Sequence, residues 1–213
     1  MKTNAAGAVM CALIVAAFAA GFYAYPLLPA QIISHWSGTG APNGALPKFW
    51  GIFLWPAVML AVFVLWSVIP LLEPLESNLK AFQRSYNLLF VALELFFCYG
   101  FALVVMFDLG HSFNIAQYLA PALAALLVAV GVLLKDSKRN FFIGIRTPWT
   151  LDSDEVWHRT HRLGAQLLYL CAACVLVGIF APQLLLALTV LPLIVVAFTT
   201  VIYSYVEFRH ERV

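Results

Sequence analysis

Residues 184–203 read LLLALTVLPLIVVAFTTVIY, a run without a charged side chain. At about 1.5 Å of rise per residue, a helix of about 20 residues spans the hydrocarbon core of a bilayer, which is about 30 Å thick. The chain holds five further apolar runs of similar length, at residues 5–24, 49–72, 88–107, 115–134 and 163–180. The sequence therefore predicts an all-α polytopic membrane protein, a bundle of six transmembrane helices.

The composition excludes the soluble classes of protein. Of the 213 residues, 63% are hydrophobic and 10% are charged, whereas an ordinary soluble domain has about 45–50% and about 25%. The formal net charge of +2 provides no basic surface for direct nucleic-acid binding. All four cysteines fall inside predicted spans, so the sequence implies no disulfide framework.

The basic residues are distributed unevenly between the loops. If the predicted helices alternate across the membrane, only Lys48 lies on one side. The other side carries Lys2, Lys80, Arg84, Lys135, Lys138, Arg139, Arg146, Arg159, Arg162, Arg209 and Arg212. Because cytoplasmic loops carry an excess of Lys and Arg, we expect both termini inside the cell. The loops at 25–48, 108–114 and 181–183 are then outside.

We expect one membrane domain over residues 1–213. Its N-terminal two-helix region covers about 5–72, and its four-helix region covers about 86–213 with an inside loop at 135–162. The first span also resembles a cleavable signal peptide, since Lys2 precedes the apolar run. We expect a retained helix instead, because the run is longer than the apolar core of about 7–15 residues that is usual in signal peptides.

The first outside loop is rich in turn-forming residues. Residues 25–50 read YPLLPAQIISHWSGTGAPNGALPKFW, in which proline and glycine recur. We expect an irregular but compact loop. Its His35 and Trp36 are candidate binding residues. Alternatively, Trp36 anchors the chain at the level of the lipid headgroups, as we expect Phe49 and Trp50 to do.

The long inside loop begins with basic residues and ends in a helix. Residues 135–164 read KDSKRNFFIGIRTPWTLDSDEVWHRTHRLG, and the first lysines attract anionic headgroups. Gly144 and Pro148 predict a non-helical stretch around them. Asp152 as N-cap with Glu155 three residues later has the form of a capping box. We expect an amphipathic helix to follow along the interface and to lead into the fifth span.

Two motifs carry a resemblance. The first reads N-x-x-x-GIRTPWTL and then E-V-W-x-x-T-H-R-x-G, between Asn140 and Gly164. It resembles the signature of the SdpI-like family of bacterial membrane proteins. The second reads LP-x-x-I-x-x-HW, from Leu28 to Trp36, and resembles a short domain of unknown function that often precedes the SdpI-like region. Together the two resemblances cover nearly the whole chain.

The resemblance implies a function that the residues alone do not. It implies a multi-pass protein of the bacterial inner membrane that confers immunity to a secreted peptide toxin, one that collapses the membrane potential of sibling cells. It also implies signalling, in which the toxin-loaded protein holds a soluble transcriptional repressor at the membrane. The expected partners are therefore membrane lipids, a toxin outside and a repressor inside.

The inside loop also contains the candidate partner- or ligand-binding residues of that side. They are Arg146, Thr147, Trp149, Trp157, His161 and Arg162. The two arginines have the planar guanidinium that grips phosphate or carboxylate, with tryptophan stacked alongside. A partner protein and a lipid headgroup both fit this chemistry, and the sequence leaves the two open.

A metal site is a weaker hypothesis for the same segment. Glu155, His158 and His161 recur three residues apart, and neighbouring helical turns can present such ligands together. The segment lacks the H-E-x-x-H pattern of metallohydrolases. We therefore expect no enzyme, no catalytic residue, no metal and no cofactor, and a metal-dependent membrane enzyme stays the second alternative function.

Glu94 is the only formal charge in the middle of a predicted span. A charged side chain at this depth costs about 2.5–3.5 kcal/mol on insertion scales. One interpretation is a proton or cation site, which would suit a small-solute or ion-coupled transporter. The other is a neutral carboxyl group that is hydrogen-bonded to a neighbouring helix.

Overall fold

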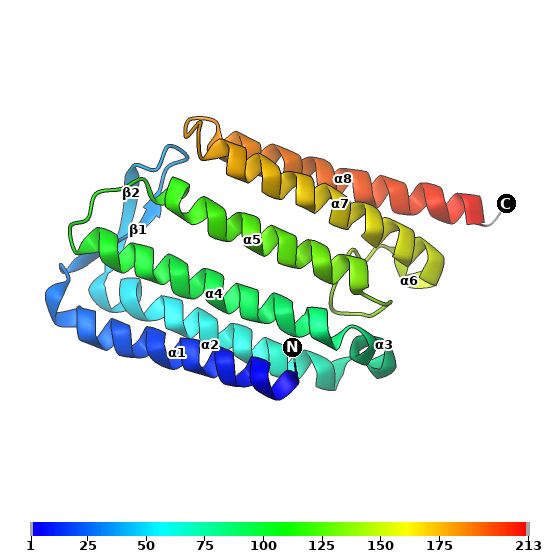
Figure 1. The fold of residues 1–213 in the computed structure, drawn as a ribbon, viewed down its shortest axis with the longest axis horizontal. Coiled ribbons are helices and arrows are strands. Elements are labelled where there is room, and N and C mark those ends of the chain that lie inside the picture. The colour runs from blue at the N-terminus through cyan, green and yellow to red at the C-terminus, as the bar shows by residue number, and fades with distance from the viewer. Residues whose placement is uncertain (1, 212–213) are drawn as a thin grey trace.

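The computed structural model describes residues 2–211, so Arg212, which we expect inside, lies outside the described residues. Six long apolar helices confirm the predicted all-α membrane architecture (Figure 1). They are α1 (Thr3–Ala24), α2 (Lys48–Leu72), α4 (Gln83–Asp108), α5 (Ile115–Asp136), α7 (Asp154–Gly178) and α8 (Leu185–Glu211). The short helices are η1 (Tyr25–Leu27), α3 (Glu76–Ala81) and α6 (Pro148–Asp152).

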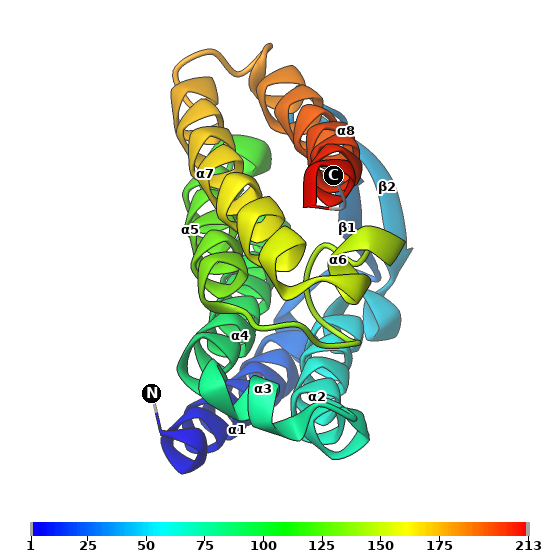
Figure 2. The same ribbon diagram turned by 90° about the vertical axis from the view of Figure 1, so that its right-hand side faces the viewer.

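The long helices form a curved row (Figures 1 and 2). Helices α1 and α2 pack against α4, α4 packs against α5, α5 against α7, and α7 against α8. The beginning of α1 and the end of α8 point to the same end of the row, which we call the termini end, together with α3 and α6. The opposite end carries the loops that we expect to be outside, and we call it the hairpin end.

The segment between α1 and α2 is a β-hairpin, so the expectation of an irregular loop is wrong. Strand β1 (Gln31–Trp36) pairs antiparallel with β2 (Pro42–Pro47). The turn is closed by the hydrogen bond from Ser37 N to Ala41 O, 2.8 Å long. Gly40 adopts φ +84° there, a conformation that glycine takes without strain. The prolines sit at the ends of β2, where a missing N–H does little harm to a two-stranded ladder.

The buried core is divided along the row. One cluster lies between α1, α2 and α4 near the hairpin end, a second lies between the same helices near the termini end, and a third lies between α5, α7 and α8. The outer helices α2 and α8 bury little of their surface, and large apolar side chains such as Leu65 and Phe198 are exposed. Such surfaces are stable when lipid is the solvent.

The inside loop differs from the expected arrangement at two helix starts. Helix α6 begins at Pro148, and Thr147 caps it in a reciprocal box with Thr150. Asp152 is the last residue of α6, and Ser153 caps α7 by accepting a hydrogen bond from Val156 N. The capping box predicted at Asp152 is therefore wrong. The fifth span begins at Asp154, so the predicted interfacial helix is the first part of α7 itself.

Candidate functional site

Two adjoining cavities lie under the hairpin, with volumes of about 650 and 290 Å³. We call them together the hairpin chamber. Residues that line both cavities are His35, Trp36, Ser37, Ala116 and Leu119. The larger cavity continues between α5, α7 and α8, and the smaller one continues towards α2 and α4. The chamber therefore connects the two halves of the curved row at the hairpin end.

The hairpin is fixed as a roof over this chamber. At its base, Ile33 N donates to Asp108 Oδ1 of α4 at 3.0 Å. At its tip, Asn114 Nδ2 donates to Thr39 O at 2.9 Å, while Asn114 Oδ1 caps the start of α5. Gly38 meets Leu186 of α8 so closely that an added Cβ would lie 2.6 Å from its side chain. Three helices therefore hold the hairpin in place.

The polar groups of the chamber come mainly from the hairpin. His35 Nδ1 lies 2.5 Å from Asn43 Oδ1 across the two strands, and both side chains are exposed at the rim. The Trp36 indole turns inward and packs edge to face on Phe107, with ring centroids 5.7 Å apart. Its Nε1 is buried and has no hydrogen-bond partner among residues 2–211. Trp36 is thus half-buried, with its indole nitrogen shielded inside the protein.

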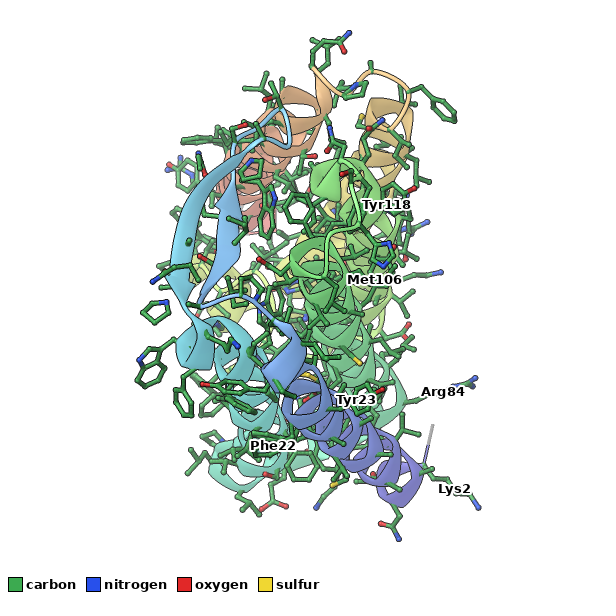
Figure 3. The ribbon with its side chains drawn as sticks, turned by 90° about the vertical axis from the view of Figure 1, so that its left-hand side faces the viewer. Lys2, Phe22, Tyr23, Arg84, Met106 and Tyr118 are labelled. Carbon is green, nitrogen blue, oxygen red and sulfur yellow. The ribbon has the colours of Figure 1, made fainter. Side chains whose placement is uncertain are left out.

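The aromatic residues expected at the headgroups occupy the outer surface. Phe49 and Trp50 are exposed and stack edge to face at the start of α2. Figure 3 views the hairpin end and shows the hairpin beside the helices, with Tyr118 and Met106 on outward faces. Exposed aromatic rings at a helix end are typical of the membrane–water interface.

At the termini end, residues 137–147 cross the row between α5 and α6 (Figure 2). Asn140 organises this crossing segment, because its Oδ1 accepts hydrogen bonds from Phe142 N and Ile143 N at 3.0 and 2.7 Å. Its Nδ2 donates to the carbonyl oxygens of Lys138 and Ile143, each at 2.9 Å. Four hydrogen bonds from one buried amide hold the segment in a single shape.

His161 joins the crossing segment to α7. Its Nε2 accepts a hydrogen bond from Ile145 N at 2.9 Å, and because a backbone N–H only donates, Nδ1 carries the proton and donates to Trp157 O at 2.7 Å. The rings of His161 and Trp157 stack with centroids 4.0 Å apart, and both side chains are fully buried. Gly144 lies against His161, where a Cβ would be 2.4 Å from Nε2.

This geometry contradicts the metal hypothesis. The Nε2 lone pair of His161 is already used, and His158 and Glu155 are exposed on other faces of α7. In the described part of the chain, no group of three His, Cys, Asp or Glu side chains is placed to hold a metal ion. The alternative of a metal-dependent enzyme on these residues therefore loses its central ligand.

The other predicted inside residues divide into buried and exposed ones. Thr147 is buried and bonds Ser204 Oγ of α8 at 3.0 Å, while Trp149 packs on Tyr205 of α8 with ring centroids 5.1 Å apart. Arg146 and Arg162 are exposed, and Arg146 Nη1 donates to Phe141 O. The structure thus gives most of the motif a packing role and leaves the two arginines at the surface.

Sequence reasoning missed Glu73 and Asn78. Glu73 is 3% exposed, and its two oxygens accept hydrogen bonds from Leu75 N and Phe141 N, each at 3.0 Å. Asn78 Nδ2 donates to Arg139 O at 2.8 Å. Both side chains tie the α2–α3 region to the crossing segment. No local sequence pattern indicates these ties, since Asn78 lies 61 residues from Arg139 and Glu73 lies 68 residues from Phe141.

Glu94 is fully buried in α4, and neither carboxyl oxygen has a hydrogen-bond partner in the structure as far as it is described. It lies seven residues from both Asn87 and Phe101, and therefore on their helix face. Trp66 Nε1 of α2 donates a hydrogen bond to Asn87 Oδ1. Phe101 belongs to the apolar cluster between α1, α2 and α4 near the hairpin end. Glu94 thus faces the α1–α2 side, but the expected hydrogen bond to a neighbouring helix is absent among residues 2–211.

Comparisons with known proteins agree with this architecture. Residues 137–204 match the SdpI/YfhL protein family, and residues 12–60 match a domain of unknown function, DUF1648. The chain is 27% identical to a curated relative, "Immunity protein SdpI" of Bacillus subtilis (strain 168), over 202 residues. The alignment covers 94% of this chain and 93% of the relative. No solved structure matches the chain significantly.

The resemblance to the SdpI-like family is therefore confirmed. The matched family region includes the crossing segment, α6, α7 and most of α8, and the second domain includes the hairpin and the adjoining parts of α1 and α2. The similarity supports an immunity-type function for a multi-pass membrane protein.

Proposed function

We propose that this chain is a multi-pass protein of the bacterial inner membrane that protects the cell by binding a secreted, membrane-active peptide toxin. The hairpin chamber supports the proposal most directly. Its volumes of about 650 and 290 Å³ fall in the range of about 300–1,000 Å³ that is usual for ligand sites. Its walls are mainly apolar side chains of the five long helices α2, α4, α5, α7 and α8, which suits a ligand that partitions into lipid.

The distribution of charge supports an outward-facing chamber. Lys48 is the basic residue nearest the hairpin, and its Nζ donates to Tyr25 O at 2.9 Å. The other described lysines and arginines belong to segments at or near the termini end, where Lys2 and Arg84 project from the bundle (Figure 3). Because Lys and Arg are enriched in cytoplasmic loops, the hairpin end faces the exterior, where a secreted toxin arrives.

The test is protection of the membrane potential. Toxin-sensitive bacteria expressing the protein at matched levels are challenged with the peptide toxin, and a voltage-sensitive dye reports the potential. We expect Ala116→Phe, which fills the chamber, to lose protection. Ala125→Phe makes the same change on an exposed face of α5 and should protect like wild type. Absence of protection by the wild-type protein, or full protection by the chamber variant, would contradict the proposal.

The termini end supports a second, cytoplasmic role in signalling. The crossing segment is rigid and presents Phe141, Phe142 and Arg146, all exposed, beside further basic residues. Aromatic and arginine side chains on a fixed backbone are typical of protein-binding surfaces. We propose this surface as the place where a soluble transcriptional repressor is held at the membrane.

Arg146→Lys tests that role, because lysine keeps the charge and loses the planar guanidinium. We expect toxin-dependent recruitment of a fluorescent repressor fusion to the membrane to fall, while protection of the potential is retained. Equal recruitment by the lysine variant would show that charge alone suffices, as for anionic headgroups.

Ion-coupled transport through Glu94 is the competing function, because this buried carboxyl group has no hydrogen-bond partner in the part of the chain that the structure describes. Glu94→Gln preserves the size of the side chain and removes its ability to ionise. The immunity proposal predicts that this variant still protects the membrane potential. Transport driven through the carboxyl group predicts instead that protection is lost. The same dye assay measures both outcomes.

A further inference from the structure

A further cavity, of about 370 Å³, lies at the termini end. It is enclosed by α3, the start of the crossing segment and the first part of α7, and Figure 2 views this end of the molecule. We call it the α3–α7 cavity. Four of its lining residues are charged, namely Lys138, Arg139, Asp154 and Glu155. The hairpin chamber has no Asp, Glu, Lys or Arg among its described lining residues, so the two sites suit different ligands.

Hydrogen bonds between distant segments fix the frame of the α3–α7 cavity. Asn78 Nδ2 donates to Arg139 O at 2.8 Å, and Trp157 Nε1 donates to Ser137 O at 3.2 Å. Arg139 Nη1 donates to Leu151 O at 2.9 Å. A site that is already held in shape loses less conformational freedom when a ligand binds.

The ion pairs around the cavity leave one cation without a counter-ion. Arg139 Nε lies 2.9 Å from Asp154 Oδ1, and Arg159 Nε lies 2.6 Å from Glu155 Oε1. Lys138 is exposed and forms no ion pair with any of residues 2–211. Each carboxylate of the lining therefore has an arginine, whereas the Lys138 ammonium group has no anion. A phosphate group is an anion that lysine binds well.

The two carboxylates restrict which phosphate fits. A phosphate monoester carries about 1.5–2 negative charges at pH 7, and Asp154 and Glu155 repel the second charge. A phosphodiester carries only one. Each carboxylate has about four lone-pair sites, so it can accept a hydrogen bond from an ammonium group while it keeps its arginine. The lining therefore favours a ligand with one phosphodiester and one ammonium group.

The position of the cavity indicates where such a ligand comes from. The apolar part of α5 ends at Leu134, directly before the lining residues of the crossing segment, and α7 begins at Asp154. The cavity thus lies where the spanning helices pass from apolar to polar sequence. This is the level of the lipid headgroups, beyond the hydrocarbon core.

We propose that the α3–α7 cavity binds a phosphodiester that carries a primary ammonium group, the chemistry of an aminophospholipid headgroup. The phosphate pairs with Lys138, and the ammonium group donates to the carboxylates of Asp154 and Glu155. The volume of the cavity lies within the range of about 300–1,000 Å³ that is usual for ligand sites. This site is independent of toxin binding at the hairpin end.

The experiment titrates the full chain in detergent with single phospholipids and measures bound lipid by native mass spectrometry. Phosphatidylethanolamine has both groups, phosphatidylglycerol lacks the ammonium group, and phosphatidylcholine has a quaternary one without N–H donors. Glycerophosphoethanolamine supplies the headgroup without acyl chains. Lys138→Gln removes the cation, and Lys135→Gln is the matched control, because Lys135 is exposed on the same segment and does not line the cavity.

We expect the wild-type protein to bind phosphatidylethanolamine about three- to tenfold more tightly than the other two lipids, as one hydrogen bond implies. Lys138→Gln should weaken this binding by a similar factor, and Lys135→Gln should change it little. Asp154→Asn should reduce the preference for phosphatidylethanolamine over phosphatidylglycerol. Binding of glycerophosphoethanolamine as tight as that of the lipid would identify a soluble phosphodiester as the ligand, whereas much weaker binding would identify the lipid.

Three results would overturn the inference. Equal weakening by Lys138→Gln and Lys135→Gln would show only the general attraction of basic residues to headgroups. Equal affinity of the wild-type protein for the three lipids would exclude recognition of the ammonium group. An unchanged preference in Asp154→Asn would remove the carboxylates as its partners. Unfolding temperatures of the lipid-free variants separate loss of the site from loss of the fold, and we expect them to match wild type for Lys138→Gln.

Discussion

At the scale of single residues, the family motif between Asn140 and Gly164 acts mainly through packing. His161 uses both ring nitrogens to hold Ile145 and its own helix, and Gly144 makes room for the ring. A sequence motif rich in His, Trp and Arg is easily interpreted as a ligand site. The structure does not support a ligand site at His161. A buried side chain whose polar atoms are all hydrogen-bonded within the protein has none left for a ligand.

Gly144→Ala tests this packing. The residue has φ +120°, which costs alanine about 1–3 kcal/mol, and its Cβ would lie 2.4 Å from His161 Nε2. We expect a loss of stability larger than that of Gly110→Ala, measured by thermal unfolding in detergent. Gly110 also has positive φ, +97°, but nothing lies within 4 Å of its added Cβ. Equal losses in the two variants would show that the contact with His161 is unimportant.

At the scale of elements, the hairpin depends on the helices around it. Two strands alone are marginally stable in water, and this pair is held by contacts to α4, α5 and α8. Ile32 anchors the base, because it is fully buried and fits against Gly51 of α2. The shape of the chamber therefore depends on how these helices are placed.

Asn114→Ala should loosen the roof. The variant loses the N-cap of α5 and the hydrogen bond to Thr39 O at the tip of the hairpin. We expect stability to fall by about 1–2 kcal/mol and hydrogen exchange to rise over residues 31–47. Ser67→Ala is the control, since Ser67 Oγ donates to the carbonyl oxygens of Phe63 and Val64 in its own helix. Unchanged exchange in the hairpin would mean that the base alone fixes it.

At the scale of the whole molecule, polar contacts at both ends join the two halves of the row. The hairpin links them at one end, and Glu73 with Asn78 links them at the other. Helix α4 meets α5 between these ends. The regions that match two different families, residues 12–60 and 137–204, are thereby built into one bundle.

Glu73→Ala should weaken the link at the termini end. The change leaves Leu75 N and Phe141 N without their acceptors, which costs about 1–3 kcal/mol for each buried group. We expect a lower unfolding temperature and faster exchange across residues 137–147. Glu76→Ala, in the exposed pair with Lys80, should change little. If both variants unfold alike, the two halves are held by apolar packing alone.

The sequence by itself determined the six spans, because hydropathy over about 20 residues is a local property and the bilayer sets the required length. It also determined the family resemblance and identified Trp36, His161 and Glu94 as unusual. Only the tertiary structure decided that Trp36 lines a chamber, that His161 is a packing residue and that Glu94 has no hydrogen-bond partner among residues 2–211. The physical reason is that burial and hydrogen bonding depend on segments distant in the chain, such as Asp108 beside Ile33 and Glu73 beside Phe141.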